Sequence, residues 1–286
     1  MGELQIGDQL ASVDGKPSHV VGVYPQGRRQ IYTITFADGR STKCCAEHLW
    51  EIYYRGWSCP RKVTTARLME LLERKRYQKR LWIDTFSGEY GSHSDIPINP
   101  WLLGALIGDG TLGGGSLRFS TASKQMLERV KATVGSGMEV KHAGKYDYRI
   151  IIRGGAHCRG VQGVQENPLV SSLQKLGLWN CPAEQKFIPS CYLDASRQIR
   201  LSLLAGLLDS DGWVEKFGSI RFCTCSKQLA KDTVTLVRSL GGTARFFVKE
   251  PGYTYRKKNM PVRQPIHATC KSLMRSRCLC LMKNSC

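Results

Sequence analysis

The spacing of hydrophobic and polar residues changes along the chain and divides it into segments of different predicted structure. Residues 1–60 contain short β-prone runs, among them 20–24 and 31–36, separated by turn signals at residues 14–15 and 38–39. We predict a small β domain there. Residues 61–95 differ, because apolar residues recur at helical spacing from Arg67 and the pattern continues through basic residues to Arg80. This segment is predicted to form a basic helix, capped by Thr64 or Thr65, followed by a linker.

One motif occurs twice, as LLGALIGDG at residues 102–110 and LAGLLDSDG at residues 204–212. The segments that follow also match, since SLRFSTASKQ (116–125) and SIRFCTCSKQ (219–228) agree at seven of ten positions. Such a repeat predicts two copies of one structural unit within residues 96–250, and it predicts equivalent roles for Asp109 and Asp211. Residues 251–286 show no clear periodicity, and we expect a degenerate or frameshifted tail.

Small residues four apart predict how the two motifs meet. Gly104 and Gly108 in the first copy correspond to Gly206 and Ser210 in the second, which allows two helix backbones to pack closely. The motif aspartates then end their helices, where the helix dipole disfavours a carboxylate. Two such ends side by side favour a bound cation, and hard oxygen ligands suit Mg²⁺. The alternative is that each Asp-Gly pair only ends a helix in a turn.

The charge balance indicates a polyanionic partner. The 286 residues contain 42 Lys and Arg against 23 Asp and Glu, a net charge of +19. Nucleic acid is the first expectation and a membrane surface the second. We find no apolar run near the length of a membrane-spanning helix and no signal-peptide pattern at the start, so we expect a cytoplasmic protein, or a nuclear one in a nucleated host. The basic helix of residues 61–81 is either a phosphate contact or a solvated face. The twelve cysteines contain no Cys-x-x-Cys pair and are expected to be reduced thiols rather than metal ligands.

The motif pair resembles the LAGLIDADG homing endonucleases, in the single-chain, two-repeat form found inside inteins. This resemblance implies an α+β fold in which an αββαββα unit occurs twice and forms a saddle, preceded here by the β-rich amino-terminal domain. It also implies a monomer that cleaves double-stranded DNA with Mg²⁺, a catalytic pair Asp109 and Asp211, and a metal site at these residues together with Gly108 and Ser210. Asp209 matches an earlier acidic position of the family but has Ile107 as its counterpart, so we do not count it as catalytic.

A second similarity lies between the motifs. Residues 167–169 (NPL), 176–178 (LGL) and 186–189 (KFIP) resemble the segment that leads to the second motif in intein endonucleases. The resemblance makes Lys186 a catalytic lysine, and the alternative is an ordinary surface lysine. Lys258 is a weaker counterpart. The sheets are expected to lie in the major groove, with candidate DNA contacts, mostly to phosphates, at Arg118, Arg149, Arg153, Arg221, Arg245 and Lys249.

The amino-terminal segment resembles the first part of an intein splicing (Hint) domain, through residues 7–10 (GDQL), 36–40 (FADGR) and 48–50 (HLW). His48 would then be the histidine that assists the first acyl shift. A splicing nucleophile does not occupy the first position, which is Met1, and Lys283 replaces the histidine before Asn284. We therefore expect a truncated or frameshifted intein with a broken splicing domain and a complete endonuclease. A splicing element and a catalytically inactive DNA-binding protein remain the alternatives.

Overall fold

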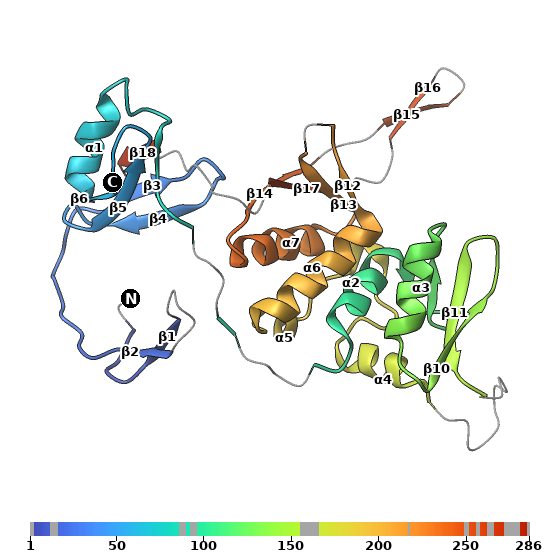
Figure 1. Ribbon diagram of the computed structural model, residues 1–286. Helices are drawn as coiled ribbons and strands as arrows, with labels where there is room; N and C mark the ends of the chain where they lie inside the picture. Colours follow the sequence, from blue (N-terminus) through green and yellow to red (C-terminus); the bar gives the residue numbers. More distant parts are fainter. Residues whose placement is uncertain are drawn as a thin grey trace.

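The computed structural model has two lobes, a β-rich amino-terminal lobe and a larger lobe of helices and antiparallel sheets (Figure 1). The structure describes residues 3–11, 17–85, 90–91, 96–154, 166–216, 218–248, 252–255, 258–261, 266–271 and 281–284. This mixture of helices and small antiparallel sheets confirms the predicted α+β class. None of the described helices is both long and apolar enough to cross a membrane.

The amino-terminal lobe contains three small sheets and one helix. Their bounds are β1 (Gln9–Ala11), β2 (Pro17–His19), β3 (Tyr32–Thr35), β4 (Ser41–Cys44), β5 (Leu49–Tyr54), β6 (Arg61–Thr64), α1 (Thr65–Glu73) and β7 (Leu81–Trp82). The strands pair as β1-β2, as β6-β5-β7, and as β3-β4 extended by β18 (Leu281–Asn284) from the other end of the chain. The lobe has its own hydrophobic core, in which Ile34, Ile52 and Leu68 are almost fully buried.

The predicted basic helix is shorter than its sequence pattern. Thr64 caps it as expected, since its hydroxyl accepts a hydrogen bond from the backbone amide of Arg67. The helix ends at Glu73, however, and residues 74–80 form turns. Tyr77 is only 3% exposed and packs against Tyr54. The chain leaves the helical path because burial of this aromatic ring outweighs continuation of a helix made of neighbouring cations.

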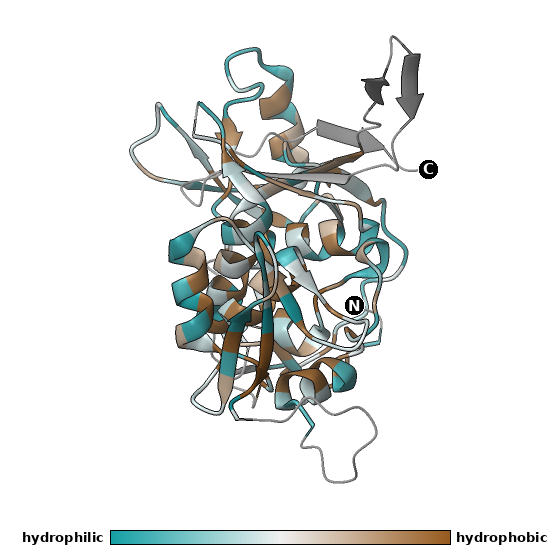
Figure 2. Ribbon diagram, turned by 90° about the vertical axis from the view of Figure 1, so that its right-hand side faces the viewer, coloured by the Kyte–Doolittle hydropathy of each residue, from teal (hydrophilic) through white to brown (hydrophobic). Residues whose placement is uncertain are grey.

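The larger lobe repeats one order of elements. The first copy contains α2 (Pro100–Asp109), β8 (Gly110–Thr111), β9 (Arg118–Ser120), α3 (Lys124–Thr133), β10 (Met138–His142), β11 (Asp147–Ile152) and α4 (Pro168–Lys175). A connection with the short helices η1 (Ala183–Gln185) and α5 (Ser190–Leu193) leads to α6 (Arg197–Asp211), β12 (Gly212–Val214), β13 (Ile220–Thr224), α7 (Lys227–Ser239) and β14 (Thr243–Val248). One hydrophobic core joins both copies, with α2 and α6 at its centre, and the helices in Figure 2 carry both hydrophobic and hydrophilic residues.

The repeated sequence encodes the same helix start in both copies. Ser123 and Ser226 cap α3 and α7, and each hydroxyl accepts a hydrogen bond from the backbone amide three residues later. The preceding Thr121 and Thr224 accept hydrogen bonds from the backbone amides of these serines. The matching sequences therefore encode the same strand-to-helix turn in both copies.

The tail, which we expected to be degenerate or frameshifted, contributes strands to both lobes. Within it lie β15 (Gly252–Tyr255), β16 (Lys258–Pro261) and β17 (Ile266–Lys271). Strand β17 lies between β13 and β14, so the second sheet has the order β12-β13-β17-β14, which corresponds to β8-β9-β11-β10 in the first. The second copy thus extends beyond residue 250, and its inner strand follows the β15-β16 hairpin. Strand β18 joins the sheet of the amino-terminal lobe instead.

Candidate functional site

Helices α2 and α6 pack so closely that glycine is required where they touch. A Cβ atom at Gly104 would lie within 3.0 Å of backbone atoms of Leu203 and Leu207, and one at Gly206 would meet the backbone of Trp101 equally closely. A Cβ atom at Gly108 would collide with Ser210. These contacts pair equivalent parts of the two motifs, so the helices run side by side in the same direction. The carboxyl ends of both helices therefore lie together, as the small-residue spacing predicts.

Asp109 and Asp211 are the last residues of these two helices. Burial first, and then the negative charge of Asp109, raise the pKa of Asp211 to about 6, while Lys186 acts in the opposite direction. Burial also raises the pKa of Asp109, again with Lys186 opposing the shift. The two carboxyl groups thus share one partly desolvated environment in which their charged forms disfavour each other. Such an environment stabilises a bound cation.

Lys186 lies at this seam, although one alternative for it was a surface position. The residue is 8% exposed, and its ammonium group donates hydrogen bonds to the carbonyl oxygens of Ile107 at 2.7 Å, Gly110 at 2.9 Å and Gly108 at 3.3 Å. Burial lowers the pKa of this ammonium group, against the raising effect of Asp211. The ammonium group of Lys186 thus donates to carbonyl groups that the end of α2 leaves without intrahelical partners. Its positive charge also offsets the negative end of the helix dipole.

The backbone of Lys186 is fixed as well. Its carbonyl oxygen accepts a hydrogen bond of 2.5 Å from the hydroxyl of Ser226, the capping residue of α7. Lys186 therefore links the end of the first motif helix to the second copy. A pocket of about 370 Å³ opens beside it, lined by residues 110–114 and by Asn180, Cys181, Pro182 and Ala183.

Asp209 takes a different role from Asp211, two residues away. Its carboxylate accepts a 2.8 Å hydrogen bond from the indole of Trp101 and forms a 3.0 Å ion pair with Arg129. The Arg129 guanidinium also stacks over the Trp101 ring at 4.2 Å. The side chain is thus occupied in a contact between α6 of the second copy and α2 and α3 of the first.

The first sheet carries a row of cations on one face. Lys141, Arg149 and Arg118 are direct partners on the adjacent strands β10, β11 and β9, so their side chains project from the same side. Phe119, the next residue on β9, is fully buried on the opposite side. Lys141 belongs to this row but was missed by sequence reasoning; the polar alternation of β10 is the only signal that could have indicated it.

The corresponding row of the second sheet is less basic. Trp213, Arg221, Thr269 and Arg245 are partners across its strands. Arg221 forms a 2.5 Å ion pair with Glu215, and the Arg245 guanidinium donates a 2.5 Å hydrogen bond to the carbonyl oxygen of Ala37 in the other lobe. Both arginines thus have protein partners, in contrast to the exposed Arg149.

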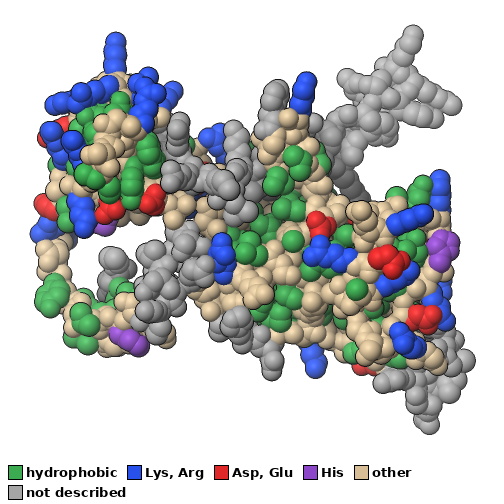
Figure 3. Space-filling model, in the orientation of Figure 1, with side chains coloured by type: hydrophobic (Ala, Val, Ile, Leu, Met, Phe, Trp, Pro, Cys, Tyr) green, Lys and Arg blue, Asp and Glu red, His purple; other side chains and the backbone are tan. Residues whose placement is uncertain are grey.

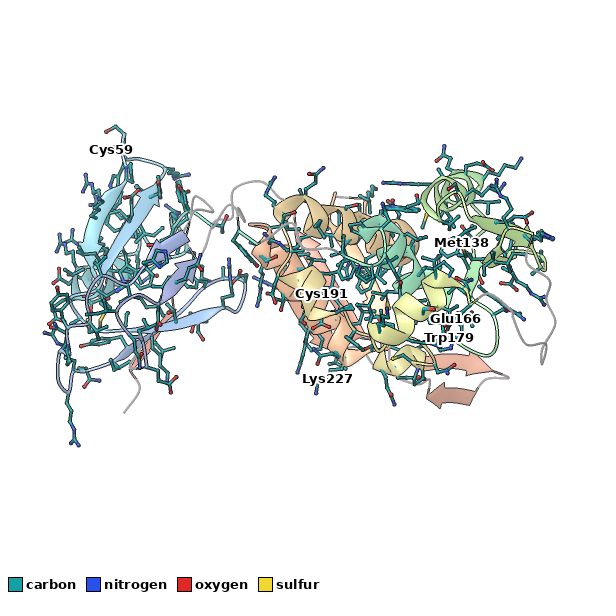
Figure 4. All side chains as sticks on the ribbon, turned by 90° about the horizontal axis from the view of Figure 1, so that it is seen from below. Cys59, Met138, Glu166, Trp179, Cys191 and Lys227 are labelled. Carbon is teal, nitrogen blue, oxygen red and sulfur yellow. The ribbon has the colours of Figure 1, made fainter. Side chains whose placement is uncertain are left out.

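The other candidate residues lie apart from the helix seam. Arg153 is exposed directly after β11, and Lys249 lies outside the described residues. His48 is exposed in the amino-terminal lobe, where its ring packs edge-on against Trp50 with 4.8 Å between ring centroids. The exposed cysteines Cys59 and Cys191 lie in different lobes (Figure 4).

A divalent cation fits the donors at the seam. The described residues contain no cluster of three or more His, Cys, Asp or Glu side chains that could hold a metal ion, so the protein ligands at the seam are limited to a pair of carboxylates. The seam offers two carboxylates, one from each copy, and burial raises the pKa of both. Mg²⁺ is commonly held by one or two carboxylates, with water and substrate phosphate completing its shell. The residues present therefore suit a magnesium site that is completed by a phosphate-containing ligand.

One part of the chain matches a known protein family, and most of the chain is similar to segments of known proteins. Residues 188–280 match the family model described as homing endonuclease. The chain is 26% identical over 264 residues to the replicative DNA helicase DnaB of Mycobacterium intracellulare, which covers 84% of this chain and 39% of that protein. It is 28% identical over 258 residues to RecA of Mycobacterium tuberculosis (strain ATCC 25618 / H37Rv), which covers 80% of this chain and 30% of that protein.

The replicative DNA helicase DnaB of Synechocystis is 26% identical over 235 residues, 78% of this chain and 25% of that protein. The chain thus spans between a quarter and two fifths of the length of these relatives. The region matched by the family model contains α6 with Asp211, α7 and the strands of the second sheet. The match therefore supports a homing endonuclease, and with it DNA binding, for this part of the chain.

Proposed function

We propose that this protein is a site-specific endonuclease of the LAGLIDADG type that hydrolyses phosphodiester bonds in double-stranded DNA with Mg²⁺. The observation that carries this proposal is the pair Asp109 and Asp211, which end two closely packed helices and share a desolvated site. The family match at residues 188–280 supports the same reaction. One chain contains both copies of the unit, so a monomer is sufficient for the complete site.

Each part of the site has a distinct task in this proposal. Asp109 and Asp211 would hold the metal, which when bound supplies Lewis acidity toward a phosphoryl oxygen and lowers the pKa of a water molecule. Lys186 holds the end of α2 in place and adds positive charge beside the reacting phosphate. The cationic row Lys141, Arg149 and Arg118 binds phosphates along the duplex. Asp209 keeps the two copies in register through Trp101 and Arg129.

The test is cleavage of DNA that carries the uninterrupted host-gene junction, identified by reading the DNA on both sides of this coding region. The wild type with Mg²⁺ is expected to cut both strands, while Asp109→Asn and Asp211→Asn bind the duplex without cutting it. Asp209→Asn is the matched control and is expected to retain cleavage. A wild type that binds with a steep salt dependence but cuts under no divalent metal would instead establish a catalytically inactive DNA-binding protein.

The relatives support an intein context for this nuclease. Proteins named as a helicase and as RecA match about four fifths of the chain, yet the chain spans only a minor part of each. A segment shared by two differently named proteins is what insertion of one mobile element into both would produce. We infer that the matched segment is such an intervening sequence.

A protein-splicing domain that no longer splices is the second candidate, and the pairing of β18 favours such a domain. Asn284 in β18 is the partner of Tyr32 in β3, and Tyr32 is in turn the partner of Cys44 in β4. Strands that flank the nuclease region in the sequence thus pair in one sheet. A splicing domain interrupted by a nuclease requires such a pairing. Expression between two flanking domains, followed by mass spectrometry, tests this function. We expect no ligated product, because Lys283 stands where a splicing histidine is needed.

A further inference from the structure

The amino-terminal lobe carries a dense group of exposed cations that the proposed cleavage reaction does not use. The basic surface, as we name it, consists of Arg55, Arg61, Lys62, Arg74, Lys75, Arg76, Lys79 and Arg80. Residues 55–80 contain only two acidic residues, Glu70 and Glu73, and Glu70 is paired with Arg67. Lys and Arg side chains gather over the upper part of this lobe in Figure 3.

Two cations of this surface, Arg61 and Arg76, are held in place by an aromatic cluster. The buried Tyr77 packs edge-on against Tyr54 with 5.0 Å between ring centroids, and it lies tilted against Trp57 with 5.7 Å between ring centroids. The Arg61 guanidinium stacks over Trp57 at 4.3 Å, and that of Arg76 stacks over Tyr77 at 4.5 Å. Because these guanidinium groups rest on fixed rings, less side-chain freedom is lost when they bind a ligand.

The backbone of the turns after α1 is fixed too. Backbone hydrogen bonds run from Tyr77 to Arg74 at 2.9 Å and from Arg80 to Tyr77 at 3.1 Å. Lys79 adopts a φ of 59°, the left-handed region that a non-glycine residue rarely occupies. The turns thus keep a conformation that is unfavourable for a lysine and that presents Lys75, Lys79 and Arg80 to solvent.

These charges lack acidic partners in the described part of the chain. Of the ion pairs found there, none involves a member of the basic surface. Like charges at this density repel each other, and a polyanion relieves the repulsion. None of the exposed large hydrophobic residues of the described chain lies between 55 and 80, so the surface lacks the apolar anchors of a membrane-binding face.

Contacts between the lobes place the amino-terminal lobe, which carries this surface, beside the second copy. The guanidinium of Arg238 on α7 donates a 2.9 Å hydrogen bond to the carbonyl oxygen of Asp38, and Arg245 on β14 donates to Ala37. Thr85 donates a 3.2 Å hydrogen bond to Gly241. In Figure 1 the second copy accordingly lies between the amino-terminal lobe and the first copy. A duplex that crosses both sheets and continues past the second therefore reaches the amino-terminal lobe.

We propose that the basic surface is a second, sequence-independent binding site for the phosphates of double-stranded DNA, adjoining the nuclease footprint. This inference rests on the proposed function, because that function brings duplex DNA to the neighbouring sheets. The surface adds affinity and takes no part in cleavage. It also resolves the alternatives for the basic segment, which were a phosphate contact and a solvated face.

The test compares two triple variants that change the net charge equally. Lys75→Gln, Lys79→Gln and Arg80→Gln together remove three cations of the basic surface. The matched control replaces the exposed helix residues Lys124, Lys175 and Lys231 by glutamine. Binding to a mixed-sequence duplex of about 40 base pairs is measured by fluorescence anisotropy across a salt series, with EDTA present so that no DNA is cut. Thermal melting checks that both variants remain folded.

Each lost phosphate contact lowers the slope of log affinity against log salt by about 0.9, so the surface variant is expected to lose about 2–3 in slope. The control is expected to keep the wild-type slope. Equal slopes for all three proteins, or equal losses in both variants, would overturn the inference and leave the nuclease proposal intact. Failure of the wild type to bind duplex would count against both proposals.

Acetylation of the wild type tests the same inference without any substitution. Bound duplex is expected to protect Lys75 and Lys79 several-fold from an acetylating reagent, as read by mass spectrometry, while Lys124 on α3 remains reactive. Unchanged reactivity of Lys75 and Lys79 at a duplex concentration that saturates the protein would contradict the proposed site.

Discussion

Replacing Asp211 by asparagine is expected to stabilise the metal-free protein while removing its metal site. The pKa of Asp211 is raised from 3.8 to about 6 by burial and by Asp109. The folded state therefore binds the Asp211 proton more tightly than the unfolded state does. The stabilisation from that proton is fully present below the unfolded pKa and is lost as the pH rises through the folded pKa of about 6. At neutral pH the ionised carboxylate consequently destabilises the fold.

The size of this effect follows from the shift. At about 1.36 kcal/mol per pKa unit, a rise from 3.8 to about 6 corresponds to about 3 kcal/mol. Asp211 is only partly buried, so solvent screening reduces the expected gain to about 1–2 kcal/mol. For a chain of this size, each kcal/mol moves the Tm by about 2–4 °C, which predicts a Tm about 2–8 °C above that of the wild type.

The assay is thermal unfolding in EDTA at a series of pH values. The difference in Tm between Asp211→Asn and wild type is expected to be near zero at about pH 4 and to reach its plateau above about pH 7. Asp209→Asn provides the control, because Asp209 lies on the same helix and its carboxylate is paired with Arg129; this variant is expected to lose stability. A Tm that is unchanged or lowered in Asp211→Asn at about pH 8, or raised equally at about pH 4, would refute the shared desolvated site.

Bound metal, close helix packing and the buried Lys186 all help to hold this site together. Mg²⁺ is expected to raise the Tm of the wild type at neutral pH but not that of Asp211→Asn, which differential scanning calorimetry can measure; equal responses would mean that the ion binds elsewhere. Gly206→Ala is expected to cost about 2–4 kcal/mol in urea unfolding, because its Cβ would meet the backbone of Trp101, whereas Gly137→Ala, with open space around it, should be close to neutral. Lys186→Met is expected to lose about 3 kcal/mol because buried carbonyl groups of Ile107 and Gly110 lose their donor, while the exposed Lys175→Met should change little; equal effects would contradict the buried role of Lys186.

The repeat was the most informative part of the sequence because it encodes local structure twice. Small residues at the helix seam predicted the contact between α2 and α6, and matching Ser-Lys-Gln segments mark the starts of α3 and α7. These features depend on residues close together in the sequence, where spacing and capping rules apply. The same locality explains why Thr64 was identified as a helix cap.

Long-range features were not predictable in this way. The position of β17 between β13 and β14 depends on strand pairing across the β15-β16 hairpin, and its own sequence has no clear alternation. The Asp209 contact with Arg129 joins residues 80 positions apart, and Arg245, expected on DNA, contacts a lobe that begins more than two hundred residues earlier. The early end of α1 likewise results from tertiary burial of Tyr77. In each case packing between distant segments decides the outcome.

Fe²⁺-directed cleavage of the polypeptide tests most directly whether the two copies jointly form one metal site. Fe²⁺ takes the place of Mg²⁺, and ascorbate with peroxide generates hydroxyl radicals at the bound ion. Cuts are expected near both Asp109 and Asp211 in the wild type. Excess Mg²⁺ is expected to suppress them, and either Asp109→Asn or Asp211→Asn is expected to abolish the cuts at both positions. Cuts near only one motif, or cuts near one motif that survive substitution of the other aspartate, would contradict a shared site.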